Sequence, residues 1–325
     1  MEEKDVSKQY SFNEIVNQID KSGISTTCKT INKYYQIIYH QYHSSSTANL
    51  EKIVKEDVSF STEVLKVANS SLFKSISDSE ITDISKAINL IGWDIVHKIG
   101  MTLSIKGLIK SIKARTFAAW LINRSVDVAN ISEIFLESLK NTNHKLADIN
   151  SIYAYGLLHD IGSLGLLQVI PDYQKDVMSI KLENNDRTWS DAEEYLYHFN
   201  HNSVGEEILL RSQLPNSFSI IAKYHHSPDP KRYTEQDSII LTLIRLAQAA
   251  LIDNHKFSEH NAFSDFTVNI EDSRRFREFH EFSFSLQSEF ERVLGLNETI
   301  YNDIKTRHLD ANFSHETSES IVTQA

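Results

Sequence analysis

A histidine and an aspartate stand side by side at His159 and Asp160, and they are the first candidates for chemistry. They come at the end of an apolar, helix-like run that Gly162 closes, within the stretch Tyr153–Ile170. An imidazole nitrogen and a carboxylate oxygen can both bind a divalent metal ion. The pair alone is weak evidence. With 14 histidines and 20 aspartates in 325 positions, random order would already place a histidine directly before an aspartate roughly once.

More histidines follow the pair. His198 and His201 are three residues apart, a spacing that predicts one face of a helix, and His225 and His226 come just before Ser227–Pro230. His198 lies among aromatic residues, so we expect it to pack rather than bind. The candidate metal ligands are therefore His159, Asp160, His201, His225 and His226. The same side chains could instead be structural histidines that satisfy backbone groups, and the sequence leaves both interpretations open.

The charge balance limits the partners of the chain. Lys plus Arg number 33 against 44 for Asp plus Glu, so the net charge is −11. A surface of this sign repels phosphate backbones, which argues against general nucleic-acid binding and against binding to anionic membranes. The basic run Lys106–Arg115 is an exception, and we expect it to be a solvated helix face.

The remaining composition predicts a soluble, cytoplasmic protein. Cys28 is the single cysteine, so an internal disulfide cannot form, which suits a reducing compartment. The start, Met1–Asp5, lacks the apolar core of a signal peptide. No run approaches the roughly 20 apolar residues of a spanning helix, so membrane insertion is not expected.

The pattern of apolar residues predicts an all-α fold. The 9 glycines and 4 prolines leave few places where helices must break. Apolar residues recur at helical spacing in Ile53–Val67, as one or two helices around Glu56 and Asp57, and again in Val126–Leu139. Alternation with turn dipeptides, which would indicate a sheet, is missing.

Three regions can be separated by composition. Residues 1–112 hold several helices and a Ser-rich loop at Ser44–Thr47, and residues 113–254 hold the histidine-rich core and all the prolines. Residues 255–325 are polar and aromatic. They contain a predicted helix at Ser273–Leu294 and a polar tail that we expect to be disordered. The phenylalanines of this helix are expected to pack onto the domain rather than to bind a partner; they are Phe276, Phe279, Phe282, Phe284 and Phe290.

Several motifs in order make the chain resemble the HDOD domain, the signalling-associated branch of the HD superfamily of helical metal phosphohydrolases. The resemblance spans roughly Phe12–Pro230 and implies an all-α bundle. It departs from the family at Val58, where proline is usual. The matching segments are Ile53–Asp57, Leu65–Phe73, Ile84–Gly92, Tyr155–Gly162, His201–Leu210, Leu214–Pro215 and Ala222–Pro228.

The resemblance also implies which positions would form a metal site. The related HD-GYP phosphodiesterases, which cleave cyclic di-GMP, use a helix histidine, the His-Asp pair, later histidines and a final aspartate. In this chain Arg124 stands where the helix histidine should be, and Gln248 replaces the final aspartate. The Gly-Tyr-Pro signature is absent after His226. The other ligand positions are retained as His159, Asp160, His201, His225 and His226.

These two replacements favour a degenerate site. Arg124 is a permanent cation that would oppose a divalent ion, and Gln248 offers a neutral oxygen instead of an anionic one. Activation of water requires a properly held metal, so we expect no catalysis and no cofactor, although the retained groups could still hold a single divalent ion. The guanidinium could instead pair with Asp160 or with a phosphate.

Three hypotheses follow from this reading. The leading one is a non-catalytic regulatory module in bacterial signal transduction that acts through contacts with other signalling proteins. The second is a metal-dependent phosphohydrolase or phosphodiesterase that acts on a nucleotide or cyclic dinucleotide. The third is a nucleotide sensor that binds phosphate at Arg124 without hydrolysis. An ion pair between Arg124 and Asp160 would favour the first.

Overall fold

The chain is all-α, as the sequence predicts. The computed structural model describes residues 10–40, 46–74, 80–140, 144–146, 149, 151–183, 187–253, 293–294, 298–304 and 306–307, and none of these residues forms a strand. The helices before the His-Asp pair are α1 (Phe12–Asp20), α2 (Gly23–His40), α3 (Ser46–Glu56), α4 (Val58–Ala68), α5 (Ser71–Lys74), α6 (Ile84–Ile91), α7 (Trp93–Lys106), η1 (Gly107–Ser111), α8 (Arg115–Leu139), η2 (His144–Leu146) and α9 (Ile152–Leu158). Those after it are α10 (Ile161–Val169), α11 (Tyr173–Glu183), α12 (Trp189–Tyr197), α13 (His201–Leu210), α14 (Asn216–Tyr224), α15 (Glu235–Asp253) and α18 (Glu298–Ile304).

Several sequence-based predictions fall wholly or partly outside the described residues. They include the predicted helix at Ser273–Leu294, of which only the last two residues are described, with all five of its phenylalanines, and the polar tail Ser314–Ala325. The second half of the Ser-rich loop predicted at Ser44–Thr47 is wrong, because α3 begins at Ser46, and its first half lies outside the described residues. The basic run Lys106–Arg115 is not one helix face, since it spans the end of α7, the 3-10 turn η1 and the start of α8.

The break between α3 and α4 shows how local sequence sets the helix boundaries. The apolar pattern around Asp57 allows one helix or two, and the structure has two. The side chain of Asp57 accepts a hydrogen bond of 2.9 Å from the backbone N–H of Phe60, which caps the start of α4. Asp83 caps α6 in the same way, through the N–H of Lys86 at 2.8 Å. Gly92 then ends α6 with a φ of 82°, a conformation that favours glycine.

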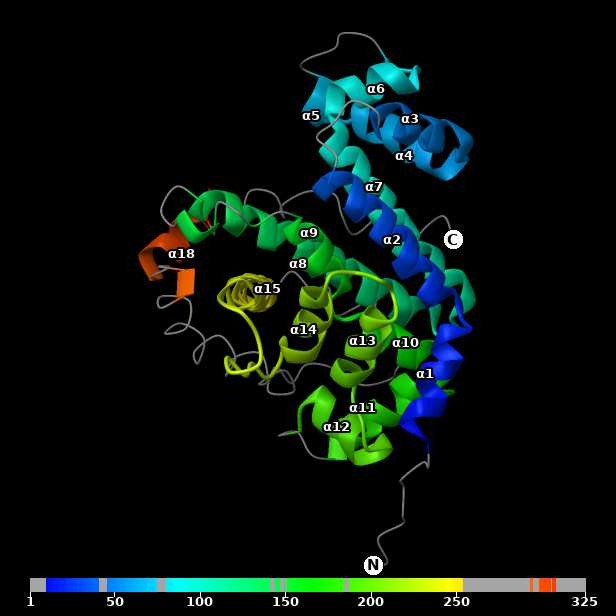
Figure 1. Cartoon of the computed structure of the whole chain (residues 1–325), viewed down its shortest axis with the longest axis vertical. Helices are drawn as coiled ribbons and strands as arrows, with labels where there is room; N and C mark the ends of the chain where they lie inside the picture. The colour runs from blue at the N-terminus through cyan, green and yellow to red at the C-terminus, as the bar shows by residue number, and fades with distance from the viewer. Residues whose placement is uncertain are drawn as a thin grey trace, which may run out of the picture.

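The helices form a larger body and a smaller lobe (Figure 1). The lobe contains α3, α4, α5 and α6, and the paired helices α2 and α7 connect it to the body. In the body the long helix α8 packs against α9 and α15, while α13 packs against both α10 and α14. This arrangement brings the ends of several short helices next to the middle of α8, where the candidate site lies.

A charged seam joins α7 to α8 and α9. The ammonium of Lys98 on α7 lies 2.8 Å from Glu133 on α8 and 2.6 Å from Asp94, and it sits over the ring of Tyr153 on α9. At the C-terminal end of α7, Lys106 interacts with Asp127 of α8, whose side chain is half-buried. Burial raises the pKa of Asp127 to about 7, and the attraction of Lys106 opposes that rise only in part.

The substitution Asp127→Asn should therefore stabilise the protein more at high pH than at low pH. The unfolded carboxyl loses its proton near its model value of 3.8 and the folded one near 7, so ionisation penalises folding across that interval. The gain should reach about 2 kcal/mol at pH 8, a value reduced for the partial exposure of the side chain, and should be roughly a third as large at pH 5, because pH 5 lies only about a third of the way from 3.8 to 7. Urea unfolding of both proteins at the two pH values measures it. An equal gain at both would contradict a raised pKa.

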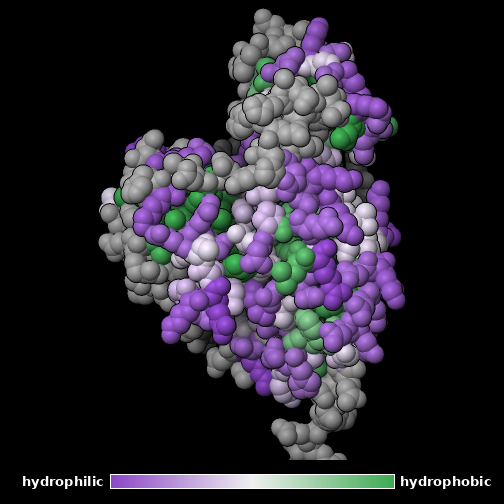
Figure 2. Space-filling model, viewed as in Figure 1, coloured by the Kyte–Doolittle hydropathy of each residue, from purple (hydrophilic) through white to green (hydrophobic). Residues whose placement is uncertain are grey.

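One face of the molecule is mainly polar. Figure 2 shows a face on which hydrophilic residues predominate and hydrophobic ones form small separate groups. The large exposed apolar side chains are Ile53, Val58, Leu182, Tyr195 and Leu210. Among the described helices, none combines the length and the apolar character that crossing a membrane would require.

Candidate functional site

The His-Asp pair lies at a junction of two helices, not inside one. Helix α9 ends at Leu158, His159 is its C-cap, and Asp160 is the N-cap of α10. Both side chains are buried. Gly162, predicted to close the helical run, is instead the second residue of α10. The turn between α9 and α10 thus presents an imidazole and a carboxylate to the same interior space.

Gly162 has a packing role that the sequence did not reveal. A Cβ atom at this position would lie 1.9 Å from the carbonyl oxygen of His201 and 2.7 Å from the backbone nitrogen of Gly205. Both of those atoms belong to α13. The missing side chain therefore allows α10 and α13 to touch backbone to backbone, and this contact places His201 beside Asp160.

His201 and His198 do not share a helix face, so that prediction is wrong. His198 is the C-cap of α12 with a φ of 60°, and its side chain is exposed rather than packed. The chain then turns, and His201 is the first residue of α13. The side chain of Asn200 caps this helix by accepting from the N–H of Ser203 at 3.1 Å. The three-residue spacing thus marks a helix-to-helix turn.

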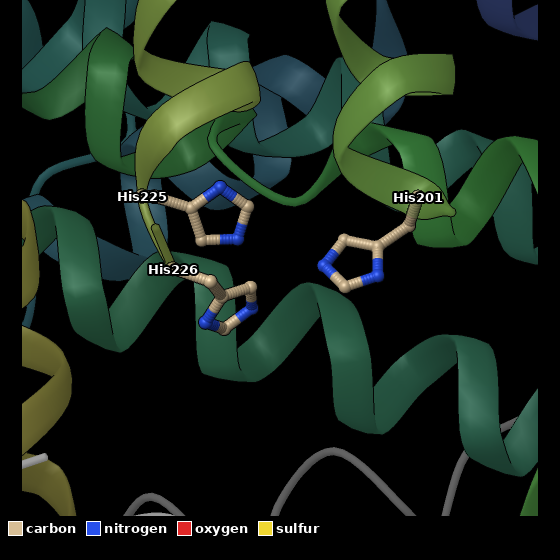
Figure 3. A group of neighbouring side chains, drawn as sticks. All are labelled: His201, His225 and His226. Carbon is tan, nitrogen blue, oxygen red and sulfur yellow. The ribbon is translucent and has the colours of Figure 1, made fainter. Parts of the chain in front are cut away.

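Three of the five candidate ligands converge. His225 and His226 directly follow α14, and their rings turn toward that of His201 (Figure 3). One ligand atom from each of these three histidines lies within 4.8 Å of the others. The ring of His159 joins them from the other side, with its centroid 5.1 Å from that of His225. The predicted clustering of these histidines is therefore present in the fold.

The hydrogen bonds of the rings orient their other nitrogens. Nδ1 of His159 donates to the carbonyl of Gly156 at 2.7 Å, and Nδ1 of His225 donates to that of Ala222 at 2.9 Å. Because Nδ1 carries the proton in such bonds, Nε2 presents a lone pair. The buried Nε2 atoms of His159, His201 and His225 have no hydrogen-bond partner in the described part of the chain. Unpaired, inward-facing nitrogens of this kind suit a bound cation.

Arg124 reaches the same space from α8. One of its guanidinium nitrogens donates to Oδ2 of Asp160 at 3.3 Å, and both side chains are buried. The other carboxylate oxygen of Asp160 accepts from the hydroxyl of Ser163 at 2.6 Å. It also lies 3.7 Å from Nε2 of His201. Both oxygens of the aspartate therefore have partners within the protein.

The charges of the site follow from this geometry. Burial alone would raise the pKa of Asp160, but His201, His159 and Arg124 outweigh burial and hold it at about 2. Burial lowers the pKa of His159 to about 4 despite the nearby carboxylate. At neutral pH the ion pair between Arg124 and Asp160 is thus fully charged, and His159 is neutral.

The other histidines divide into two groups. Burial and the neighbouring histidines hold the pKa values of His225 and His226 well below their usual range. Burial also acts against protonation of His201, but Glu193 outweighs it and raises the pKa of that imidazole. The neutral rings of His225 and His226 therefore face the ring of His201, which is more readily protonated than an ordinary histidine.

Gln248 lies on α15 and is buried. Neither its side-chain oxygen nor its nitrogen makes a hydrogen bond within the residues that the structure describes. The structure thus pairs Arg124 with the aspartate of the His-Asp pair, and it places Gln248 in the interior as a buried amide.

Glu193 is a member of the site that the sequence did not single out. It is fully buried on α12, and its Oε2 accepts from both Nδ1 and the backbone N–H of His201, at 2.7 and 2.9 Å. The spacing of apolar Ala192 and Leu196 on either side was the one available signal that this position faces inward.

Comparisons with solved structures show the same fold. An HDOD domain protein of unknown function from Geobacter sulfurreducens is 18% identical with a TM-score of 0.55, and the match covers 92% of this chain and 93% of that one. A candidate phosphohydrolase from Shewanella amazonensis is 14% identical with a TM-score of 0.53, over 90% and 94% of the two chains. A candidate signal transduction protein from Marinobacter aquaeolei is 14% identical with a TM-score of 0.54, over 93% and 68%.

A comparison with curated proteins gave no significant match. The family model of the HDOD domain matches residues 26–228, which is more than half of the chain and includes Arg124, the His-Asp pair and the converging histidines. On this match the chain belongs to the HDOD domain family.

Proposed function

We propose that this HDOD protein is a non-catalytic regulatory module that works through contacts with other signalling proteins. The observation that carries the proposal is the buried ion pair between Arg124 and Asp160. In this pair the carboxylate of the His-Asp motif is bound to a side chain of the protein itself, and the permanent positive charge of Arg124 lies beside it. The name of the Marinobacter aquaeolei neighbour, a candidate signal transduction protein, agrees with this class of function.

The physical reason is electrostatic. Hydrolysis by a metal centre needs an ion held strongly enough to lower the pKa of its bound water toward neutrality. An anionic ligand is the main source of that binding strength, and Asp160 is already bound to Arg124 and Ser163. A second cation brought to Asp160 would meet the repulsion of the guanidinium at short range. The arrangement therefore disfavours a hydrolytic centre.

Turnover measurements test this proposal. The full-length protein, loaded with Mn²⁺, would be incubated with bis(p-nitrophenyl) phosphate and with cyclic di-GMP. We expect product formation no faster than that of the Asp160→Asn variant. Multiple turnover by the wild-type chain, lost in both Asp160→Asn and His201→Ala, would instead establish a phosphohydrolase, the class named for the Shewanella amazonensis neighbour.

A second candidate function is the binding of one transition-metal ion by His201, His225 and His226. Two observations favour it: these three rings converge, with one ligand atom of each within 4.8 Å of the others, and the Nε2 atoms of His201 and His225 lack hydrogen-bond partners within the described residues. Three imidazoles suit Zn²⁺, Cu²⁺, Fe²⁺ or Ni²⁺, so these residues fit the group. Such an ion would supply a Lewis acid or a structural crosslink. In this second function the three histidines hold a single ion beside the ion pair of Arg124 and Asp160. The ion would either be sensed by the module or crosslink its helices.

A nucleotide ligand has less support. Its phosphate would have to compete with Asp160 for Arg124, since the two side chains are already paired.

The domain organisation proposed here keeps the boundaries expected from composition. Residues 1–112 form the N-terminal helical part, 113–254 the core and 255–325 the C-terminal region. Two features support this division. The first boundary falls at Ile112, between η1 and α8, and every candidate site residue from Arg124 to Gln248 lies in the core.

A further inference from the structure

Glu193 is a buried carboxylate whose two oxygens both point at groups of the protein. Oε2 accepts from Nδ1 and from the backbone N–H of His201. Oε1 accepts from the hydroxyl of Tyr173, which in turn accepts from the indole N–H of Trp189 at 3.0 Å. A continuous chain of hydrogen bonds thus runs from Trp189 through Tyr173 and Glu193 to His201.

Both ends of the bond between Glu193 and His201 are fixed by their helices. The start of α12 is held by a capping box between Thr188 and Asp191, and the start of α13 by one between Asn200 and Ser203. Glu193 lies in the second turn of α12, and His201 is the first residue of α13. A single carboxylate oxygen that bonds both the ring and the backbone of His201 leaves that imidazole little freedom to rotate.

The direction of the ring decides what its other nitrogen can do. With Nδ1 bonded to Glu193, Nε2 of His201 faces His225 and His226, and it has no hydrogen-bond partner among the described residues. A carboxylate that accepts a hydrogen bond from one imidazole nitrogen also makes the opposite nitrogen more basic, and therefore a stronger ligand for a metal ion. Burying an anion is costly unless it is well bonded, so a role beyond packing is worth testing at this position.

We propose that Glu193 is a positioning residue, which holds His201 with Nε2 toward His225 and His226 and so sets the affinity of these three histidines for one transition-metal ion. The proposal rests on the second candidate function above. It differs from a purely structural role, in which Glu193 would only bond the N-terminus of α13. A structural role predicts a loss of stability on substitution and no separate change in metal binding.

The test compares metal affinity among folded variants of the full-length protein. Co²⁺ would be titrated into wild type, Glu193→Ala, Glu193→Gln and Tyr173→Phe, with the visible absorption band as readout, and Zn²⁺ affinity measured by competition with a chromophoric chelator. We expect a loss of about 10- to 100-fold for Glu193→Ala. Glu193→Gln should lose less, because its amide oxygen can still accept from His201. Tyr173→Phe should lose least, because it leaves the bond to His201 intact.

A matched control separates positioning from stability. Val64→Ala removes buried volume from α4 in the lobe, away from the histidines, and it should destabilise the fold without changing Co²⁺ affinity or its spectrum. A folded Glu193→Ala protein with wild-type affinity and spectrum would overturn the proposal. Glu193→Ala affinity that falls only as far as that of Val64→Ala would overturn it as well.

The ring of His201 can also be observed directly. Nitrogen-15 spectra of the imidazoles, recorded at alkaline pH where the ring of His201 is neutral, should show the proton on Nδ1 in metal-free wild type and a mixture of tautomers in Glu193→Ala. If wild type binds no metal, the single-ion function fails and with it the effect on affinity, while these spectra still decide whether Glu193 orients His201. An unchanged tautomer in Glu193→Ala would show that Glu193 does not position the ring.

Discussion

Gly162→Ala is expected to destabilise the protein by about 3 kcal/mol or more, because a methyl group at this position has nowhere to go. Its Cβ would stand 1.9 Å from the carbonyl oxygen of His201, and that oxygen is backbone and cannot move aside without shifting α13. Helix propensity alone predicts the opposite sign, since alanine is favoured over glycine inside a helix by about 1 kcal/mol. The steric effect should therefore be clear in urea unfolding measured by circular dichroism.

Gly107→Ala is the control for that measurement. Gly107 has ordinary helical backbone angles, and an added Cβ would meet no atom within 4 Å. It should leave stability unchanged or raise it slightly. If both substitutions behave alike, close backbone packing between α10 and α13 is not what fixes glycine at position 162.

Arg124→Met is the second substitution with a large expected effect. It leaves the carboxylate of Asp160 buried without its guanidinium partner, and breaking a buried ion pair in this way costs about 3–5 kcal/mol. The loss should be largest at neutral pH. The pKa of Asp160 is held at about 2, so in the folded protein its charge persists down to acidic solution. Urea unfolding at pH 7 measures the change.

Two further variants identify the cause. Arg124→Met combined with Asp160→Asn removes both charges and should recover much of the lost stability, as a double-mutant cycle would show. Arg211→Met breaks the partly exposed pair with Asp20, 2.5 Å long, and should cost about 1 kcal/mol or less. If both arginine substitutions lower the free energy of unfolding equally, burial does not make the Arg124–Asp160 pair more stabilising than an exposed one.

Much of the fold could be predicted from the sequence, because apolar spacing and caps act locally. The end of α6 at Gly92 follows from the preference of a single residue, and the capping by Asp57 explains the break that the apolar pattern left open. The clustering of His201, His225 and His226 came from motif order, which the structure realises as three converging rings.

What could not be predicted depends on contacts between distant helices. The role of Gly162 exists only because α13 crosses α10 at that residue, and no local pattern encodes the crossing. His198 and His201 have the spacing of a helix face, but a left-handed residue at His198 ends the helix between them. Glu193 could not be singled out from the sequence, because its partners, Tyr173 and His201, are supplied by other helices.

The central claim is that the guanidinium of Arg124 pairs with the carboxylate of Asp160, so that this carboxylate is not free to help hold a second metal ion. Its most direct test is the number of metal ions bound per chain. The full-length protein would be saturated with Mn²⁺ or Zn²⁺, desalted and measured by inductively coupled plasma mass spectrometry. The account predicts no more than one ion per chain. Two ions retained per chain, with one lost in Asp160→Asn, would contradict it.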